Sequence, residues 1–277
     1  MYPFINVGSL HLGTYGICFV TGFFLGYFIL GAELRRRQIT RVRSVEIVFA
    51  LALCALVSSK LYLALESPAL YLLHPLRLLN RIGFTYYGGL AGAVVALIFL
   101  ARRYRLPFLT LCDTLSVACA LGYGIGRVGC FLAGDGDYGI ATSLPWGMTF
   151  PHGLIPTTVP VHPAPLYEIG TSAAIALGLW RLGSPARRPP ARRGEVFAHF
   201  LLWTGVARIL VEFIKRNPVV AFGLVSAQFV GLVSAAIGLG LLYEIARRAK
   251  RPGVTGGGSS GPRSALTSVH ATSRNRP

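Results

Sequence analysis

Hydrophobic stretches of about 20 residues, separated by short polar connections, recur along most of this chain. A helix needs roughly 20 apolar residues to cross a bilayer core of about 30 Å. Seven stretches come close enough to this length to be interpreted as spanning helices, which predicts an all-α integral membrane protein with seven transmembrane helices. The expected helices are at 10–32, 45–65, 84–101, 107–130, 166–182, 196–214 and 219–246.

Basic residues alternate in density between successive connections, and this pattern orients the helices. Four places hold 17 of the 27 Lys and Arg residues: 33–43, 102–105, 181–193 and 247–251. The opposite side carries four, at Arg77, Arg81, Lys215 and Arg216. Because cytoplasmic connections are enriched in Lys and Arg, we expect the N-terminus outside and the C-terminus in the cytoplasm.

Two of the connections on the non-cytoplasmic side are long, at 66–83 and 131–165. The second joins the expected helices 4 and 5, and loops of that length are often functional. Residues 252–277 are mostly Gly, Ser, Thr and Arg, which predicts a disordered cytoplasmic tail after a membrane domain at 1–251. No internal repeat is visible, which disfavours the many transporter folds built from repeats.

Composition supports the membrane interpretation. The chain is 53% hydrophobic and 13% charged, which is far from an ordinary soluble domain. The formal net charge is +17, but the basic residues lie in short clusters between apolar segments. This distribution indicates membrane topology, and we expect no nucleic-acid partner.

The five cysteines are odd in number and contain no CxxC pair, so we expect free thiols. The first apolar segment has no preceding basic region and is expected to remain uncleaved.

Polar residues inside the expected helices converge on one level. Given the direction of each helix, they lie near its outer end, whereas only Glu46 and Asp113 lie toward the cytoplasm. Charged groups within membrane segments are costly and usually functional. The outer group comprises Tyr15, Lys60, Tyr87, Arg127, Tyr167, Glu168, Arg208 and Glu212.

Arg127 is the leading candidate in this group. It ends an apolar run in the sequence GYGIGRVGC, whose small residues let a ligand or a neighbouring backbone approach closely. Arg208 lies at the same level on another helix. Two guanidinium groups at headgroup depth suit a phosphate, because each donates hydrogen bonds in a planar fork and stays charged. The expected ligand is an anionic phospholipid, and His162, at the membrane surface, is a candidate polar contact to it.

Simpler interpretations remain open. Arg208, Glu212 and Lys215 have helical spacing and could form a self-neutralising ladder. Arg127, Lys60 and the tyrosines could be interfacial anchors. Asp135 and Asp137 form a D-x-D pair, but without further acids nearby they make a weak calcium site, and we expect neither a metal nor a cofactor. Cys130 has no adjacent base that would make it a nucleophile.

Several motifs, in this order along the chain, resemble the prolipoprotein diacylglyceryl transferase family. The most specific is GRVGCFLAGDGDYG at 126–139, followed by LPWG at 144–147. VHPAPLYE at 161–168 is similar to the family's HPSQLYE, and ARILVEFIKRNP at 207–218 to its R-x-x-x-E-x-x-R segment. TYG at 14–16 and SAQ at 226–228 match shorter elements, and the similarity covers about residues 8–245.

The resemblance implies transfer of the diacylglyceryl group of phosphatidylglycerol to the thiol of a prolipoprotein lipobox cysteine, with release of glycerol phosphate. This is the first step of lipoprotein maturation, at the outer leaflet of the bacterial inner membrane. The matching positions imply catalytic roles for Arg127, Arg208, Glu212 and His162. They imply substrate-binding roles for Tyr15, Lys60, Tyr87, Gly88, Gly89, Cys130, Asp135, Gly139, Tyr167, Glu168 and Lys215.

The chain also departs from the family pattern. Tyr87 replaces a histidine that is a candidate base, Cys130 replaces an asparagine, Asp135 replaces a glutamate and Thr204 replaces a tyrosine. These changes leave three alternatives open. A related transferase would use a different acceptor, a lipid-binding or transport protein would need a polar path to the cytoplasmic face, and a structural subunit would have its charged cluster paired with itself.

Overall fold

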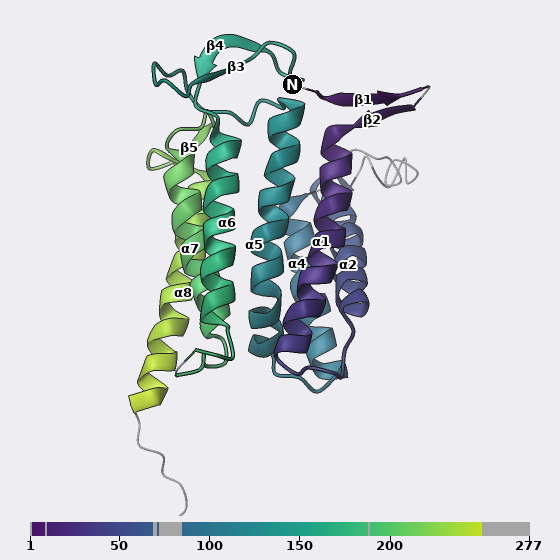
Figure 1. Cartoon of the computed structure of the whole chain (residues 1–277), viewed down its shortest axis with the longest axis vertical. Helices are drawn as coiled ribbons and strands as arrows, with labels where there is room; N and C mark the ends of the chain where they lie inside the picture. Colours follow the sequence, from purple (N-terminus) through teal and green to yellow (C-terminus); the bar gives the residue numbers. More distant parts are fainter. Residues whose placement is uncertain (1, 9, 69–70, 72–84, 188, 251–277) are drawn as a thin grey trace, which may run out of the picture.

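In the computed structural model, the described part of the chain contains seven long helices that form one bundle (Figure 1). The structure describes residues 2–8, 10–68, 71, 85–187 and 189–250. The expected connection at 66–83 and the expected tail at 252–277 therefore lie almost wholly or wholly outside the described residues. The helices are α1 (Thr14–Arg36), α2 (Ser44–Glu66), α4 (Tyr86–Arg103), α5 (Phe108–Ala133), α6 (Ala164–Leu182), α7 (Glu195–Glu212) and α8 (Ser226–Lys250).

Helix α5 lies at the centre of the bundle. Helices α1, α2 and α4 lie on one side of it, and α6, α7 and α8 on the other (Figure 1). It contacts α1, α4, α6 and α7, and it is far more buried than the other long apolar helices. Four of the described helices, α1, α2, α5 and α8, are long and apolar enough to cross a membrane. The all-helical membrane architecture is therefore supported.

Three short antiparallel hairpins, which the sequence did not predict, lie at one end of the bundle (Figure 1). Their strands include residues that the apolar pattern assigns to helices or to loops. The first apolar helix starts at Thr14, because 10–13 pairs as a strand, and α8 starts only at Ser226, because 219–225 forms a hairpin. The strands are β1 (Phe4–Val7), β2 (Leu10–Gly13), β3 (Met148–Phe150), β4 (Thr157–Val161), β5 (Val219–Ala221) and β6 (Leu224–Val225).

The long connection at 131–165 is an ordered unit with its own small core. Phe150 and Val161 are fully buried there, and Tyr138 stacks on Phe150 with ring centroids 4.7 Å apart. Helix α5 ends at Gly134, which has φ +59° and whose N–H donates to the carbonyl of Cys130. A Cβ there would lie 2.6 Å from the Cα of Gly153, so only glycine permits this approach of two backbones.

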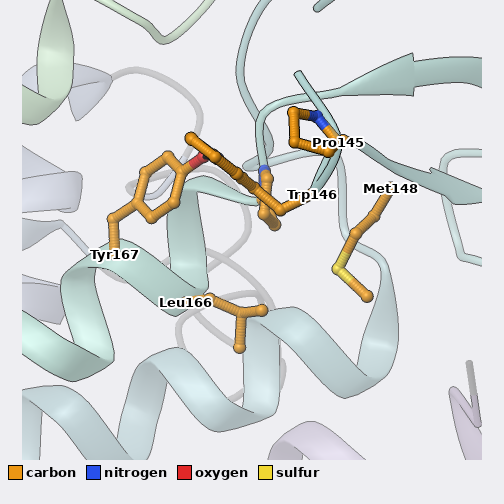
Figure 2. Close-up of a pocket in the computed structure, with 7 residues that line it drawn as sticks. Pro145, Trp146, Met148, Leu166 and Tyr167 are labelled. Carbon is orange, nitrogen blue, oxygen red and sulfur yellow. Dashed lines mark hydrogen bonds between the residues drawn. The ribbon is translucent and has the colours of Figure 1, made fainter. Parts of the chain in front are cut away.

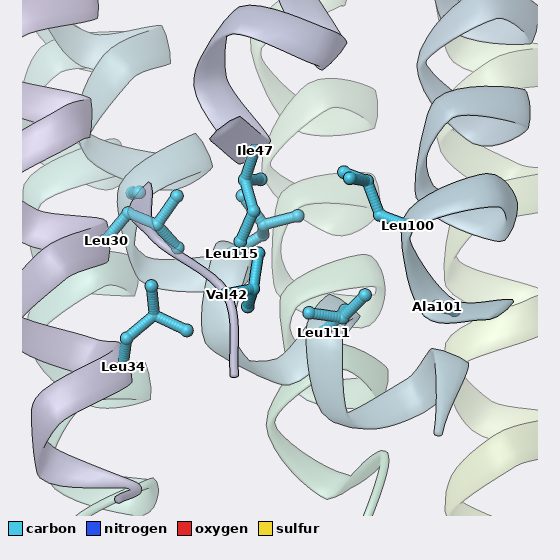
Figure 3. Packing of buried hydrophobic residues seen from close by; sticks show 9 residues of the cluster. Leu30, Leu34, Val42, Ile47, Leu100, Ala101, Leu111 and Leu115 are labelled. Atoms are coloured by element: carbon cyan, nitrogen blue, oxygen red, sulfur yellow. The ribbon is translucent and has the colours of Figure 1, made fainter. Parts of the chain in front are cut away.

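Figure 3 shows the largest apolar cluster of the described residues, which lies at the helix ends opposite the hairpins of Figure 1. It joins the last turns of α1 and α4 to the first turns of α2 and α5. The fully buried members of the cluster include Leu30, Ile47 and Leu111, and Leu34, Leu100 and Leu115 are nearly so.

Helices α7 and α8 pack through glycines that bring their backbones together. A Cβ at Gly205 would lie 2.6 Å from the carbonyl oxygen of Gly231, and one at Gly238 would lie 2.7 Å from that of Ala198. Small residues at such contacts are the common means of close helix packing in membranes. The α7–α8 pair thus fixes the position of α7, which carries Arg208 and Glu212.

This packing predicts different effects on stability for the glycine-to-alanine substitution at two positions. Gly205→Ala should lower the free energy of unfolding by about 1–3 kcal/mol, because the new methyl group forces the helices apart. Gly240→Ala on α8 is the matched control, since a Cβ there has nothing within 4 Å. It should be neutral or slightly stabilising, because alanine favours helix over glycine by about 0.8–1 kcal/mol.

Thermal unfolding of the detergent-solubilised variants measures both effects. Equal stability of the two variants would contradict the proposed backbone contact.

Candidate functional site

Three cations and three carboxylates from distant parts of the sequence meet at the hairpin end of the bundle. The cations are Arg127 on α5, Arg208 on α7 and Lys215 just after α7. The carboxylates are Asp137 in the connection after α5, Glu168 on α6 and Glu212 at the end of α7. We call these six residues the ion network. The expected convergence of outer polar residues is seen for Arg127, Glu168, Arg208 and Glu212, which Asp137 and Lys215 join.

Arg127 joins two of the carboxylates. Its Nε lies 3.2 Å from Oε2 of Glu168, and its Nη1 pairs with Oδ2 of Asp137. Nη1 also lies 3.7 Å from Sγ of the buried Cys130. The guanidinium carbon sits 5.0 Å from the ring centroid of Tyr123, one helical turn earlier, in a cation–π geometry. The small residues around Arg127 leave it room for all these neighbours.

Arg208 shares Glu168 with Arg127. Its Nη1 is 3.2 Å from Oε1 of Glu168, and its Nη2 is 2.9 Å from Oε1 of Glu212, four residues later on the same helix. The hydroxyl of Tyr123 accepts a hydrogen bond from Arg208 at 3.0 Å and donates one to Glu168 at 2.5 Å. Asn217 donates a hydrogen bond of 2.5 Å to the other carboxylate oxygen, Oε2, of Glu212. Glu168 and Glu212 are thus held by several partners each.

Lys215 lies outside helix α7, because the helix ends at Glu212. The expected ladder along one helix is therefore formed only between Arg208 and Glu212. The ammonium group of Lys215 turns inward, 2.9 Å from Oδ1 of Asp137 and 3.0 Å from Oε2 of Glu168. Its side chain is 1% exposed. The network therefore reaches from the end of α7 to the connection after α5.

Backbone pairing holds these segments together. The N–H of Gly139 donates to the carbonyl of His162 at 2.8 Å, and the N–H of Ile140 donates to that of Ile214 at 2.8 Å. A Cβ at Gly139 would lie 2.5 Å from the Ile214 carbonyl oxygen, so the glycine is required for this approach. Beside it, burial raises the pKa of Tyr138. Gly139 therefore serves the site by placing Asp137 beside Lys215.

An open, mostly apolar hollow of about 620 Å³ lies next to the ion network at the start of α6 (Figure 2). Trp146, Met148, Leu166 and Tyr167 line it. Indole Nε1 of Trp146 donates to the hydroxyl of Tyr167 at 2.8 Å, and that oxygen lies 3.2 Å from Nδ1 of His162. The HPAPLYE motif thus supplies both Tyr167, which forms an aromatic rim with Trp146, and the adjacent Glu168 of the ion network.

The network has no net charge, because three cations face three carboxylates. It is therefore self-paired to a considerable degree, as a structural subunit would require. Both arginines nevertheless keep hydrogen-bonding capacity: Nη2 of Arg127 and Nε of Arg208 form no hydrogen bond within the described part of the chain. Their side chains are 16% and 30% exposed. The arrangement can therefore receive an anion by exchanging partners.

Other expected site residues surround the network or lie away from it. Tyr15 on α1 is adjacent, because a Cβ at Gly129 of α5 would lie 3.3 Å from its Cα. Asp135 accepts a hydrogen bond from the N–H of Asp137 at 3.2 Å and forms a turn. Asp137 forms the ion pairs with Arg127 and Lys215, and a substrate-binding role of Asp135 remains a prediction.

The expected residues on α2 and α4 occupy the other side of α5 (Figure 1). A Cβ at Gly88 would lie 2.6 Å from Cβ of Tyr62 on α2, so this glycine serves helix packing. Gly89 faces the carbonyl of Ala55 in the same contact. Lys60 and Tyr87 are partly and largely exposed, respectively. Their roles in substrate binding remain predictions.

Asp113 and Glu46, the two acids that the sequence places toward the cytoplasm, have structural partners. Asp113 is 2% exposed and accepts hydrogen bonds from the N–H groups of Gly194 and Phe197, at 2.7 and 2.8 Å, which caps the start of α7. Glu46 pairs with Arg43 and accepts a hydrogen bond from the hydroxyl of Tyr104. Neither acid is left to line a path for a charged ligand, which disfavours a transporter.

Sequence reasoning missed two members of the site. Tyr123 lies in the GYGIGR run, one turn before Arg127, and that spacing was a usable signal. Asp137 was considered only as half of a metal pair. Among the described residues, no group of three or more His, Cys, Asp or Glu side chains is placed to hold a metal ion. The position of Lys215 beside Asp137 depends on where α7 ends, which the apolar pattern does not reveal.

Comparison of the sequence with known proteins identifies the family of the chain. The sequence model of the family described as "Prolipoprotein diacylglyceryl transferase" matches residues 3–244. Proteins named phosphatidylglycerol–prolipoprotein diacylglyceryl transferase are similar over most of the chain. That of Geobacter sulfurreducens is 34% identical over 82% of this chain and 86% of its own. The Nitrosomonas europaea protein is 31% identical over 90% of this chain and 91% of its own. The Bordetella parapertussis protein is 33% identical over 89% of this chain and 96% of its own. The chain belongs to the prolipoprotein diacylglyceryl transferase family.

Proposed function

We propose that this protein transfers the diacylglyceryl group of phosphatidylglycerol to the thiol of a prolipoprotein cysteine, the first step of lipoprotein maturation. The observation that carries the proposal is the ion network, in which two arginines and a lysine from three segments face one point at the end of the bundle. Membership of the family and the names of the similar proteins support the same activity.

The charge balance of the reaction fits this site. The acceptor thiol loses its proton to water or to the departing phosphate, its sulfur forms a bond to the terminal glycerol carbon of the lipid, and the bond from that carbon to the phosphate oxygen breaks. The phosphodiester carries one negative charge, whereas the departing glycerol phosphate carries up to two. Cations preorganised around the phosphate therefore stabilise the transition state more than the bound substrate.

The proposed roles follow from the contacts of each residue. Arg127 and Arg208 bind the phosphate with their remaining donors. Glu212 orients Arg208, to which it lies 2.9 Å away, and His162 makes a polar contact to the substrate from the rim formed with Tyr167. Lys215 and Glu168 complete the charged wall. Tyr15 and Cys130 flank Arg127 where the headgroup enters.

The proposed arrangement in the membrane places all seven helices across the bacterial inner membrane. The N-terminus and the β3–β4 unit lie outside, and residues 252–277 form a cytoplasmic tail after the transferase domain at 1–251. The distribution of Lys and Arg among the connections supports this orientation. The site then faces the outer leaflet, where a phospholipid headgroup and the lipobox cysteine of a precursor can meet.

A second candidate function is transfer to a different acceptor. It is favoured by the residues near Arg127 and on α4 that differ from the family pattern, Cys130 and Tyr87. A cell that lacks the ordinary enzyme separates the two candidates, because only a prolipoprotein transferase restores its growth. Restored lipoprotein lipidation would reject the different acceptor.

The direct test is incubation of the purified full-length protein with phosphatidylglycerol labelled in its acyl chains and a lipobox peptide. We expect a labelled thioether product and free glycerol phosphate in equal amounts. A protein that binds the lipid without forming either product would be a lipid-binding protein.

Substitutions in the network should remove activity selectively. Arg127→Ala and Arg208→Ala should each reduce kcat by about 100-fold or more, as loss of one preorganised donor to a developing oxyanion does. Arg216→Ala is the matched control, because this exposed arginine is next to Lys215 but outside the network. Its rate should stay close to that of the unchanged protein. A fully active Arg127→Ala or Arg208→Ala protein would exclude the phosphate role.

The proposed domain limits and topology can be checked together. Truncation after Arg251 should leave transfer activity unchanged, because the tail has little that can be buried. A fluorescent reporter that folds only in the cytoplasm should fluoresce when fused at this point. A fusion that does not fluoresce in cells with intact transfer activity would contradict the proposed orientation.

A further inference from the structure

Asp137 differs from the other carboxylates of the ion network in its exposure and in its partners. Its side chain is 26% exposed, whereas those of Glu168 and Glu212 are 4% and 0% exposed. Glu168 contacts Tyr123 and all three cations, and Glu212 is fixed by Arg208 and Asn217. Asp137 is therefore the carboxylate whose departure from the network costs the least free energy.

The position of Asp137 is that of a small anion bridging two cations. One oxygen pairs with Nη1 of Arg127, and both oxygens lie 2.9 Å from Nζ of Lys215. A phosphate oxygen pair would use the same donors, since a guanidinium and an ammonium group each bind carboxylate and phosphate alike. The carboxylate and a phosphodiester also carry the same charge, so an exchange between them keeps the network neutral.

The backbone around Asp137 allows this exchange without a loop movement. Gly136, with φ +92°, precedes it, and the buried, stacked Tyr138 follows it. Gly139 is then fixed by its hydrogen bond to His162. The main chain is thus anchored directly after Asp137, and rotation of one short side chain is enough to move the carboxylate toward solvent.

We propose that Asp137 is an internal counter-ion that occupies the phosphate position between Arg127 and Lys215 and is displaced by the lipid headgroup. The inference rests on the proposed function for the identity of the anion. With Asp137 displaced, the network has three cations and two carboxylates, and its positive charge acts on the phosphate as the leaving group gains charge. The return of Asp137 to the cations then helps to expel glycerol phosphate.

The test uses the full-length, detergent-solubilised protein and glycerol phosphate as the probe. Asp137→Asn removes the competing charge and keeps the shape of the side chain. Glycerol phosphate should bind this variant about tenfold more tightly, within the usual range of coupling between neighbouring ligands. In the transfer assay, KM for phosphatidylglycerol should fall, and kcat should fall as well, because product release becomes slower.

Two further variants make the result specific. Asp137→Glu retains the charge and should restore weaker glycerol phosphate binding. Glu244→Gln removes one carboxylate from ion pairs with Arg247 and Arg248 on the last turns of α8, at the other end of the bundle, and should bind as the unchanged protein does.

Unchanged or weaker glycerol phosphate binding by Asp137→Asn would overturn the inference. Weaker binding together with a lower melting temperature would mean that the carboxylate only holds Arg127 and Lys215 in place. Failure of the proposed function is seen separately, as absence of thioether product from the unchanged protein, while the binding measurement still decides whether Asp137 and a phosphate compete.

Discussion

The structure depends on the balance of charge at the end of the bundle. Arg127, Arg208 and Lys215 lie where water is partly excluded, and Lys215 is almost fully buried. Removing one partner of a buried ion pair costs about 3–5 kcal/mol, because the other charge is left uncompensated. The three carboxylates are therefore a condition for placing three cations together. Helix ends, the β3–β4 unit and the turn after α7 all serve to bring these six side chains to one point.

In the proposed function, the self-paired network and the phosphate site are two states of the same arrangement. The pairing that would suit a purely structural role uses only part of the hydrogen-bonding capacity of Arg127 and Arg208, and it includes one exposed carboxylate. A site for an anion has to remain stable when the anion is absent. Internal carboxylates of graded exposure meet that need, since the buried ones hold the cations in place and the exposed one can be replaced.

The sequence revealed the part of the site that lies on long helices. Hydrophobic periodicity and the positive-inside pattern gave the helices and their directions, and direction alone placed Arg127, Glu168 and Arg208 at one level. Asp137 and Lys215 could not be placed in this way, because both lie in irregular segments whose course depends on Gly139 and on backbone pairing with Ile214. The hairpins at 4–13 and 219–225 escaped prediction because their apolar residues continue the pattern of the adjoining helices.

The central position of α5 has a consequence for how the family can diverge. The members of the ion network lie between positions 127 and 215, so α1, α2 and α4 are linked to it chiefly through the contacts of α5 with α1 and α4. Within the first half of the chain, α2 and α4 pack mainly against each other. Substitutions on that pair, such as tyrosine at position 87, can thus accumulate and alter what approaches the site from that flank without disturbing the charge balance on the other side of α5.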